Sequence, residues 1–272
     1  MKDMTTIIPS KNRPLQLSLA LGSLFSRCEN FEMPDVNVIY KCDSEYEDAY
    51  SNLKEEWAGV NFIKENSFRH DVMNCLEGHP YVFFVVDDCI FTHDFDLRKT
   101  TNHLDNHENV FGVSLRLGKN TTYCYTMDRP QQIPNFVANH SGILSYEWMD
   151  AQLDFAYPAE VSSSVYRTKD FATVFSAYRF RNPNELESLM FSVTRVFGRT
   201  MFLLSCFEQS VAFCNPCNKV QNVALNNRAG IDTYYTPENL LNLYNQGVRI
   251  NPEMFHGFVS NSTHMEVSLI HD

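Results

Sequence analysis

The sequence predicts an α/β protein built around a mainly parallel sheet. Over the first hundred or so residues, short apolar runs alternate with helix-like segments, a pattern typical of parallel strands joined by crossover helices. One run, residues 81–86, is continuously apolar and rich in β-branched and aromatic residues, as expected for a central strand covered on both faces. With 272 residues, 44% of them hydrophobic, the chain suits a single large domain, residues 1–272, with a substantial core.

The first half of the chain divides into repeated strand and helix units. A first strand, residues 5–8, stops at Pro9, and Pro14 suits the first turn of the helix that follows. A segment of capping-box form, Ser44 to Glu47, predicts the start of a second helix. The expected strands are 5–8, 36–40, 60–63, 81–86 and 110–115, and the expected helices are 15–25, the segment from 44, 68–77 and 95–106.

The second half has a less regular pattern. Residues 116–165 are rich in Asn, Pro and Tyr and are expected to be irregular, and such loops often carry function. Apolar residues then recur at helical spacing in three segments, and two shorter runs are strand-like. The expected helices are 168–178, 184–196 and 237–244, and the expected strands are 201–205 and 264–270.

Composition limits the classes of partner and the cellular location expected for this protein. The formal net charge of -11 argues against nonspecific nucleic-acid binding, which depends on Lys and Arg neutralising phosphates. The longest apolar stretch, residues 81–86, is far shorter than the roughly 20 residues of a membrane helix. The N-terminal residues lack the apolar segment of a signal peptide, so a cytoplasmic location is expected. The eight cysteines then suit reduced, buried side chains.

Polar residues follow four of the predicted strands at the point where each strand ends. They are Pro9 to Arg13, Cys42-Asp43, Asn66 to His70, and Asp87-Asp88. Ligands of open parallel sheets bind beyond the carboxyl ends of the strands, so a site is expected there. Two adjacent carboxylates after an apolar strand repel each other unless a cation or a hydrogen-bond network lies nearby. Mg²⁺ or Mn²⁺ with a substrate diphosphate is one explanation, and a helix cap is the other.

The segment Val85-Val86-Asp87-Asp88-Cys89-Ile90-Phe91 resembles the short acidic motif of GT-A glycosyltransferases. Thr6 to Pro14 is similar to the first strand and loop of that fold, which contacts the nucleotide. Further segments resemble those of a little-described bacterial group within this family-2-like superfamily: 114–120, 154–158, 182–187 and 244–266. The resemblance implies a mainly parallel GT-A sheet flanked by helices, with a nucleotide-sugar-binding half, 1–115, and an elaborated acceptor-binding half, 116–272.

The resemblance also implies roles for particular residues. The common motif is Asp, any residue, Asp, whereas this chain has Val86 in the first place, so Asp88 is the expected metal ligand. His264 is expected to add a second ligand to Mn²⁺ or Mg²⁺, since a neutral imidazole can serve. The expected nucleotide-sugar-binding residues are Pro9, Ser10, Lys11, Arg13, Asp43, Arg69, Asp87, Arg116 and Asn120.

A transfer with inversion needs a carboxylate that takes the proton of the acceptor hydroxyl. Similar sequences carry an Asp-Gly pair shortly after the Tyr-Pro segment, where this chain has Ser162-Ser163. Glu160 and Asp154 lie close enough in sequence to substitute and are the expected catalytic residues. Glu147 and Asp150 remain alternatives.

These expectations describe a glycosyltransferase of polysaccharide biosynthesis that moves a sugar from a nucleotide-diphosphate sugar to a hydroxyl of a glycan or lipid-linked acceptor. A sugar nucleotidyltransferase is one alternative, although residues 9–14 contain no glycine for its usual loop. A carbohydrate-binding scaffold without catalysis is another. The pair Cys214 and Cys217 has no second ligand pair at suitable spacing and is not expected to bind zinc.

Overall fold

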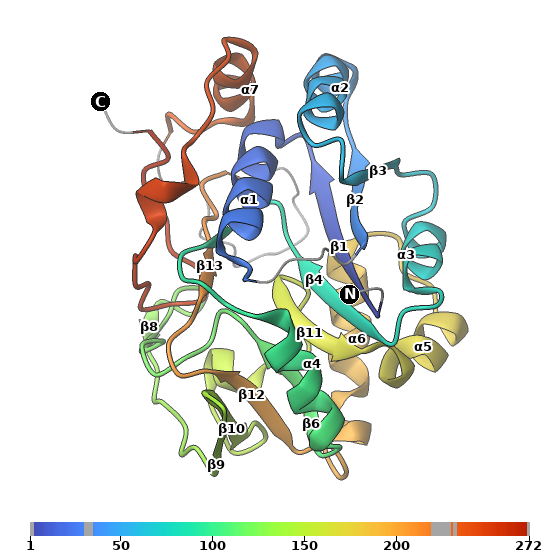
Figure 1. Cartoon of the computed structure of the whole chain (residues 1–272), viewed down its shortest axis with the longest axis vertical. Coiled ribbons are helices and arrows are strands. Elements are labelled where there is room, and N and C mark those ends of the chain that lie inside the picture. Colours follow the sequence, from blue (N-terminus) through green and yellow to red (C-terminus); the bar gives the residue numbers. More distant parts are fainter. Residues whose placement is uncertain (1–2, 30–34, 219–229, 231–232, 271–272) are drawn as a thin grey trace.

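The structure is a computed structural model that describes residues 3–29, 35–218, 230 and 233–270. Among these residues the main sheet has nine strands in the order β3-β2-β1-β4-β11-β6-β12-β10-β9 (Figure 1). Its strands are β1 Met4–Lys11, β2 Asp35–Lys41, β3 Asn61–Lys64, β4 Tyr81–Val85, β6 Val110–Ser114, β9 Ala138–His140, β10 Ile143–Glu147, β11 Ser163–Arg167 and β12 Leu203–Phe207. The predicted α/β class with a mainly parallel central sheet is therefore confirmed.

Helices cover both faces of this sheet. The helices are α1 Pro14–Arg27, α2 Glu47–Glu56, α3 Phe68–Leu76, α4 Leu97–Asn106, α5 Thr168–Ala177, α6 Pro183–Phe197 and α7 Pro237–Asn245. Figure 1 shows α7 beside α1, whereas α5 and α6 lie together elsewhere along the sheet. Two-stranded pairings outside the main sheet join β5 Cys89–Phe91 to β13 Ala212–Cys214, and β7 Tyr123–Cys124 to β8 Arg129–Pro130.

The apolar run of β4 is buried on both faces because its side chains alternate between two separate clusters. Phe83 packs in the cluster that contains residues of α1 and α2, and Phe84 packs in the cluster that contains residues of α3, α5 and α6. Strands β1, β2 and β3 are parallel, and β1 is also parallel to β4. The prediction of a central strand covered on both faces is confirmed.

Strand β11 runs against the direction of both of its neighbours, β4 and β6. It begins at Ser163, inside the region that was expected from the sequence to be irregular, and β10 also lies in that region. That expectation was wrong for these segments. Because β11 is antiparallel to β4, its first residues lie at the same edge of the sheet as the end of β4.

The expected strand at residues 264–270 is also absent from the described structure. One isolated bridge joins Cys214 and His264. Beyond it, the Asn215 side chain accepts a hydrogen bond from Val267 N at 3.3 Å and donates to Val267 O at 3.0 Å. A side chain therefore takes the place of a neighbouring strand's backbone, and no ladder continues.

Candidate functional site

Four strands that share one direction, β1, β2, β4 and β6, end at the same edge of the sheet. The segments that follow them carry most of the residues expected in the site. Ligands of open α/β sheets bind at such an edge.

Asn12 joins the ends of β1 and β2. Its backbone has a positive φ of 53°, a conformation that Asn tolerates better than most residues. Its side chain donates to Asp43 Oδ2 at 2.6 Å and accepts from Asp43 N at 3.0 Å. Asp43 was expected in the site from the sequence and Asn12 was not, although the enrichment of Asn at positive φ was a signal that could have drawn attention to it.

Arg13 lies between the two carboxylates of the acidic pair. Its Nη1 is 3.0 Å from Asp87 Oδ1 and 3.0 Å from Asp88 Oδ2. Its Nε and Nη2 donate to the side chain and backbone oxygens of Asn218, at 3.0 Å and 2.6 Å. The second Asp87 oxygen accepts from Lys11 N at 3.3 Å. Of the cations expected at this edge, Arg13 and the backbone of Lys11 contact the acidic pair, with Arg13 between the two acids.

The surroundings of this cluster are largely buried. The side chains of Arg13, Asp87 and Asp88 are 12%, 7% and 14% exposed. Burial raises the pKa of Asp88, and the nearby Arg13 guanidinium opposes that shift. Tyr50, on α2, contacts the end of β1 and the residues that follow it. Its hydroxyl is 2.7 Å from Ser10 Oγ and accepts from Arg13 N at 3.3 Å. Its contacts fix the backbone that positions Arg13.

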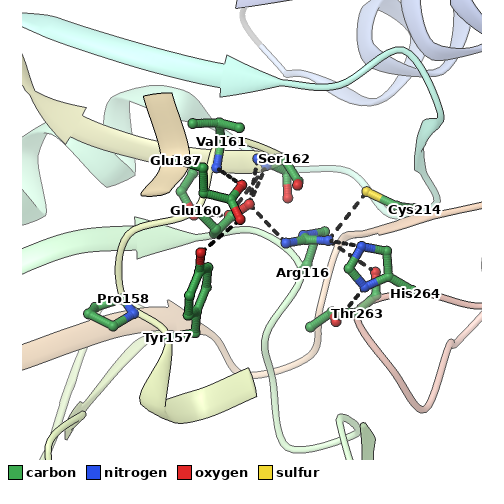
Figure 2. Close-up of polar contacts among 12 residues, drawn as sticks. Arg116, Tyr157, Pro158, Glu160, Val161, Ser162, Glu187, Cys214, Thr263 and His264 are labelled. Carbon is green, nitrogen blue, oxygen red and sulfur yellow. Dashed lines mark hydrogen bonds and ion pairs between the residues drawn. The ribbon is translucent and has the colours of Figure 1, made fainter. Parts of the chain in front are cut away.

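Arg116, two residues beyond β6, forms a second cluster (Figure 2). Its Nη2 donates to Glu160 Oε2 at 2.8 Å, and its Nη1 lies 3.1 Å from His264 Nε2. Burial, followed by the charge of Arg116, lowers the pKa of His264 to about 3, so this imidazole is neutral at physiological pH. As an acceptor facing Arg116, His264 Nε2 has no lone pair left for a metal ion in this arrangement.

Glu160 is held by several donors besides Arg116. It accepts from Ser162 N at 2.5 Å and Ser163 N at 3.1 Å, and from the Ser164 hydroxyl. Together with the Arg116 guanidinium these make four donor groups on one carboxylate, which leave little room for a substrate hydroxyl. The hydrogen bonds of Glu160 instead indicate that it fixes Arg116 and the entry to β11.

Glu187, on α6, is a carboxylate that was not expected from the sequence to be a base. It accepts from Tyr157 Oη at 2.9 Å and Val161 N at 3.2 Å, and it lies beside Glu160 in Figure 2. Burial, followed by the charge of Glu160, raises the pKa of Glu187. Its place in the segment 182–187, already singled out by the resemblance, was the available signal.

Asp154, the other expected base, lies in a short 3₁₀ helix at Leu153–Ala156. Its oxygens accept from Cys124 Sγ at 3.4 Å and Gln131 Nε2 at 3.1 Å. Burial raises the pKa of Asp154 as well. Asp154 and Glu187 are thus both carboxylates whose environment favours taking up a proton.

Two expected donor-binding residues contact other parts of the protein. Arg69 donates from Nε to Phe175 O at 3.0 Å and from Nη2 to Ser176 O at 2.8 Å, which satisfies carbonyls at the end of α5. Asn120 donates to Ser210 Oγ at 2.7 Å and Ser260 O at 2.6 Å. Both side chains connect structural segments, so the structure does not bring them to the acidic pair.

The geometry of the acidic pair does not fit a divalent cation in this arrangement. Mg²⁺ needs oxygen ligands at about 2.0–2.1 Å in a near-octahedral array. The facing oxygens of Asp87 and Asp88 both accept from one Arg13 nitrogen, and His264 faces Arg116. Within the described part of the chain, no group of three or more His, Cys, Asp or Glu side chains could hold a metal ion. Cys214 and Cys217 are buried free thiols.

Comparison with known proteins bears on the fold. No family model matches the chain. The chain is 29% identical over 205 residues to the bifunctional glycosyltransferase pgtA of Dictyostelium discoideum, an alignment that covers 65% of this chain and 26% of that protein. The chain therefore spans about a quarter of that relative.

Among solved structures, S. aureus TarS is similar to this chain with a TM-score of 0.50 and 14% identity, covering 79% of this chain and 36% of TarS. Residues 1–349 of TarS, solved in complex with UDP-GlcNAc, give a TM-score of 0.48, with 15% identity, over 82% of this chain and 60% of that one. The fold is that of GT-A glycosyltransferases, as the sequence predicted. In the described residues, no helix is long and apolar enough to cross a membrane.

Proposed function

We propose that this protein is a glycosyltransferase that moves a sugar from a nucleotide-diphosphate sugar to a hydroxyl group. The observation that carries the proposal is the cluster of Asn12-Asp43 and Arg13 with Asp87 and Asp88 at the carboxyl edge of a GT-A-type sheet. The sequence similarity to a glycosyltransferase over 205 residues supports it.

The donor is proposed to lie across the ends of β1, β2 and β4, in the half formed by residues 1–115. Asp43, held by Asn12, accepts hydrogen bonds from the base, and Arg13 and Lys11 face the diphosphate. Arg suits phosphate because its planar fork of N–H groups matches phosphate oxygens. Asp87 and Asp88 hold Arg13 in place, and the sugar lies beside them.

The sequence led us to expect Mn²⁺ or Mg²⁺ at Asp88 to neutralise the diphosphate, but Arg13 occupies the facing oxygens of the acidic pair. Because Arg13 already contacts both carboxylates, the chain's own residues carry the proposed reaction. The acceptor oxygen forms a bond to the anomeric carbon, while the bond from that carbon to the diphosphate oxygen breaks. The nucleoside diphosphate leaves with the bonding electron pair, and the acceptor proton passes to a carboxylate.

Glu187 and Asp154 are the proposed alternatives for that carboxylate. Glu187 is tied to the acidic pair by a short path through backbone: Val161 N donates to Glu187, and the next residue, Ser162, accepts from Val86 N at 3.2 Å. Val86 directly precedes Asp87. Glu187 is thus linked through these hydrogen bonds to the segment that carries the acidic pair, and it belongs to the proposed acceptor half, residues 116–272.

The acceptor is proposed to be a glycan or lipid-linked sugar. Tyr157 stacks on Phe191, with ring centroids 4.7 Å apart, and Phe191 is 42% exposed. An exposed aromatic ring beside a carboxylate offers an apolar surface for a sugar face. The role in polysaccharide biosynthesis and the cytoplasmic location stay predictions from the sequence.

Calorimetric titration with UDP-GlcNAc, UDP-glucose, UDP-galactose and GDP-mannose tests the proposal, each with and without Mn²⁺. At least one donor is expected to bind, and that donor should then be consumed in the presence of glycan acceptors. A nucleotidyltransferase would instead release pyrophosphate from a nucleoside triphosphate and a sugar phosphate. Failure of all donors to bind would remove the proposed function.

A further inference from the structure

Arg13 is held in a fixed position by the turn before it and by groups from two distant parts of the chain. The positive φ of Asn12 turns the chain at the end of β1, and Arg13 follows at once. Asp87 and Asp88 approach its Nη1 from the end of β4, and Asn218 contacts its Nε and Nη2 from 205 residues further along. A buried guanidinium with this many partners is preorganised for binding a ligand.

The contacts of Arg13 also offset part of the charge of the acidic pair. Adjacent carboxylates with 7% and 14% side-chain exposure repel each other and lose hydration. One guanidinium placed 3.0 Å from each reduces both effects, and it does so at the position that a divalent cation takes in many diphosphate sites. The two carboxylate oxygens nearest to Arg13 are therefore both already paired with a cationic nitrogen, whose single positive charge offsets one of the two negative charges.

Arg13 keeps donor capacity for an anion. Its Nη2 carries two hydrogens, and within the described residues its acceptor is the Asn218 carbonyl. Burial opposes the charge of Arg13, but the two aspartates more than compensate and raise its pKa, so the guanidinium stays charged at any physiological pH. A phosphate oxygen arriving at this edge meets a permanent cation.

We propose that Arg13 takes the place of the divalent cation in this site, so that the diphosphate group of the donor binds without metal. The inference rests on the proposed function for the identity of the diphosphate ligand. The central statement, that Arg13 occupies the cation position between Asp87 and Asp88, does not depend on any nucleotide.

The first test measures Mn²⁺ binding by electron paramagnetic resonance in the absence of nucleotide. The wild-type protein is expected to bind no Mn²⁺ at this pair, whereas Arg13→Ala should gain a Mn²⁺ site that is lost again in Arg13→Ala/Asp88→Asn. Arg13→Lys is the matched control, because it retains a cation and should remain without Mn²⁺. A wild-type Mn²⁺ site that Asp88→Asn removes would overturn the proposal, and so would a folded Arg13→Ala that gains none.

The second test uses the unaltered protein and so does not depend on the variants folding. The affinity for the donor identified in the calorimetric screen is expected to change less than twofold between EDTA and Mn²⁺. A tenfold or greater loss of donor affinity in EDTA would overturn the metal-independent site while leaving the glycosyltransferase proposal standing. If no donor binds at all, the proposed function fails, and the Mn²⁺ measurement still decides the role of Arg13.

Discussion

Arg116 and Glu160 form an ion pair in which both side chains are 7% exposed and Nη2 lies 2.8 Å from Oε2. Arg116 comes from the end of β6, and Glu160 from the segment that enters β11. The pair therefore joins two strands at the edge where the donor is proposed to bind. Breaking a buried pair leaves one charge without compensation, which makes the pair a structural requirement of this edge.

Glu160→Ala is expected to lower the free energy of unfolding by about 3–5 kcal/mol, because it leaves the Arg116 guanidinium buried and without its carboxylate. Urea denaturation measures the change. Glu208→Ala is the control, since Glu208 pairs with Lys119 where the two side chains are 61% and 51% exposed. Exposed pairs contribute about 0–1 kcal/mol. Equal losses in the two variants would contradict a structural role for Glu160.

Glu187→Gln and Asp154→Asn separate the two proposed bases. The variant of the true base should lower turnover by about 10²–10⁴-fold while changing donor affinity little. A base must be deprotonated to act, and burial raises the pKa of both carboxyls. The acidic limb of the wild-type pH–rate profile should therefore lie at a higher pH than an ordinary carboxyl group would give. It should disappear in the variant of the true base. Retention of full turnover in both variants would show that neither residue is the base.

Asp43→Ala is expected to weaken nucleotide binding more than pyrophosphate binding. The carboxylate is held by Asn12 through two hydrogen bonds and is proposed to contact the base. Loss of a hydrogen bond to a charged group costs about 1.5–3 kcal/mol, which corresponds to roughly 10- to 100-fold in affinity. Calorimetry with the nucleoside diphosphate and with pyrophosphate compares the two ligands. An equal loss of affinity for both ligands would mean that Asp43 contacts the phosphates or supports the fold instead.

His103 is expected to make the stability of the protein depend on pH, because it is buried in a group of three histidine rings. Its ring lies 4.4 Å from that of His107 and 6.1 Å from that of His140, and its Nε2 is 3.0 Å from Ser205 Oγ. Burial, followed by the charges of His107, His140 and Arg167, lowers the pKa of His103 to about 4. Because the folded pKa lies below the ordinary value of about 6.5, folding favours neutral His103, and this stabilisation is lost as pH falls from about 6.5 to 4.

The matching experiment is urea denaturation at pH 7 and pH 5 for the wild type and His103→Gln. The wild type should lose more stability on acidification than the variant, which cannot bind a proton at this position. Identical pH dependence in the two proteins would show that His103 does not titrate differently in the folded and unfolded states.

The sequence was most informative where one residue pattern had one structural solution. The continuous apolar run at 81–86 could be buried on both faces only in the middle of the sheet, and it marked the position of Asp87 and Asp88. Strand β11 was harder to predict, because its buried Ser163 and Ser164 lie in a polar-looking segment where backbone and side-chain donors of these serines contact Glu160. Burial of those serines depends on a partner that local sequence does not reveal.

The cation at the acidic pair illustrates the same limit. The adjacent carboxylates indicated that a cation or a hydrogen-bond network lies nearby, and the sequence favoured a metal ion. The structure places Arg13 there, through the backbone turn at Asn12 and the contacts of Asn218. Such a choice among cations depends on contacts between residues far apart in the chain, which periodicity and motif spacing do not encode.

Backbone amide NMR spectra recorded during titration with the donor found by calorimetry test the central claim most directly. The largest shifts are predicted to occur at Lys11, Asn12, Asp43 and Asp88, at the carboxyl edge of β1, β2 and β4. Asp3→Asn, at the opposite end of β1, should leave the donor affinity unchanged, and Asp88→Asn should reduce it. Shifts concentrated around Asp3 and Asp35, or a donor affinity that Asp88→Asn leaves unchanged, would contradict the proposed site.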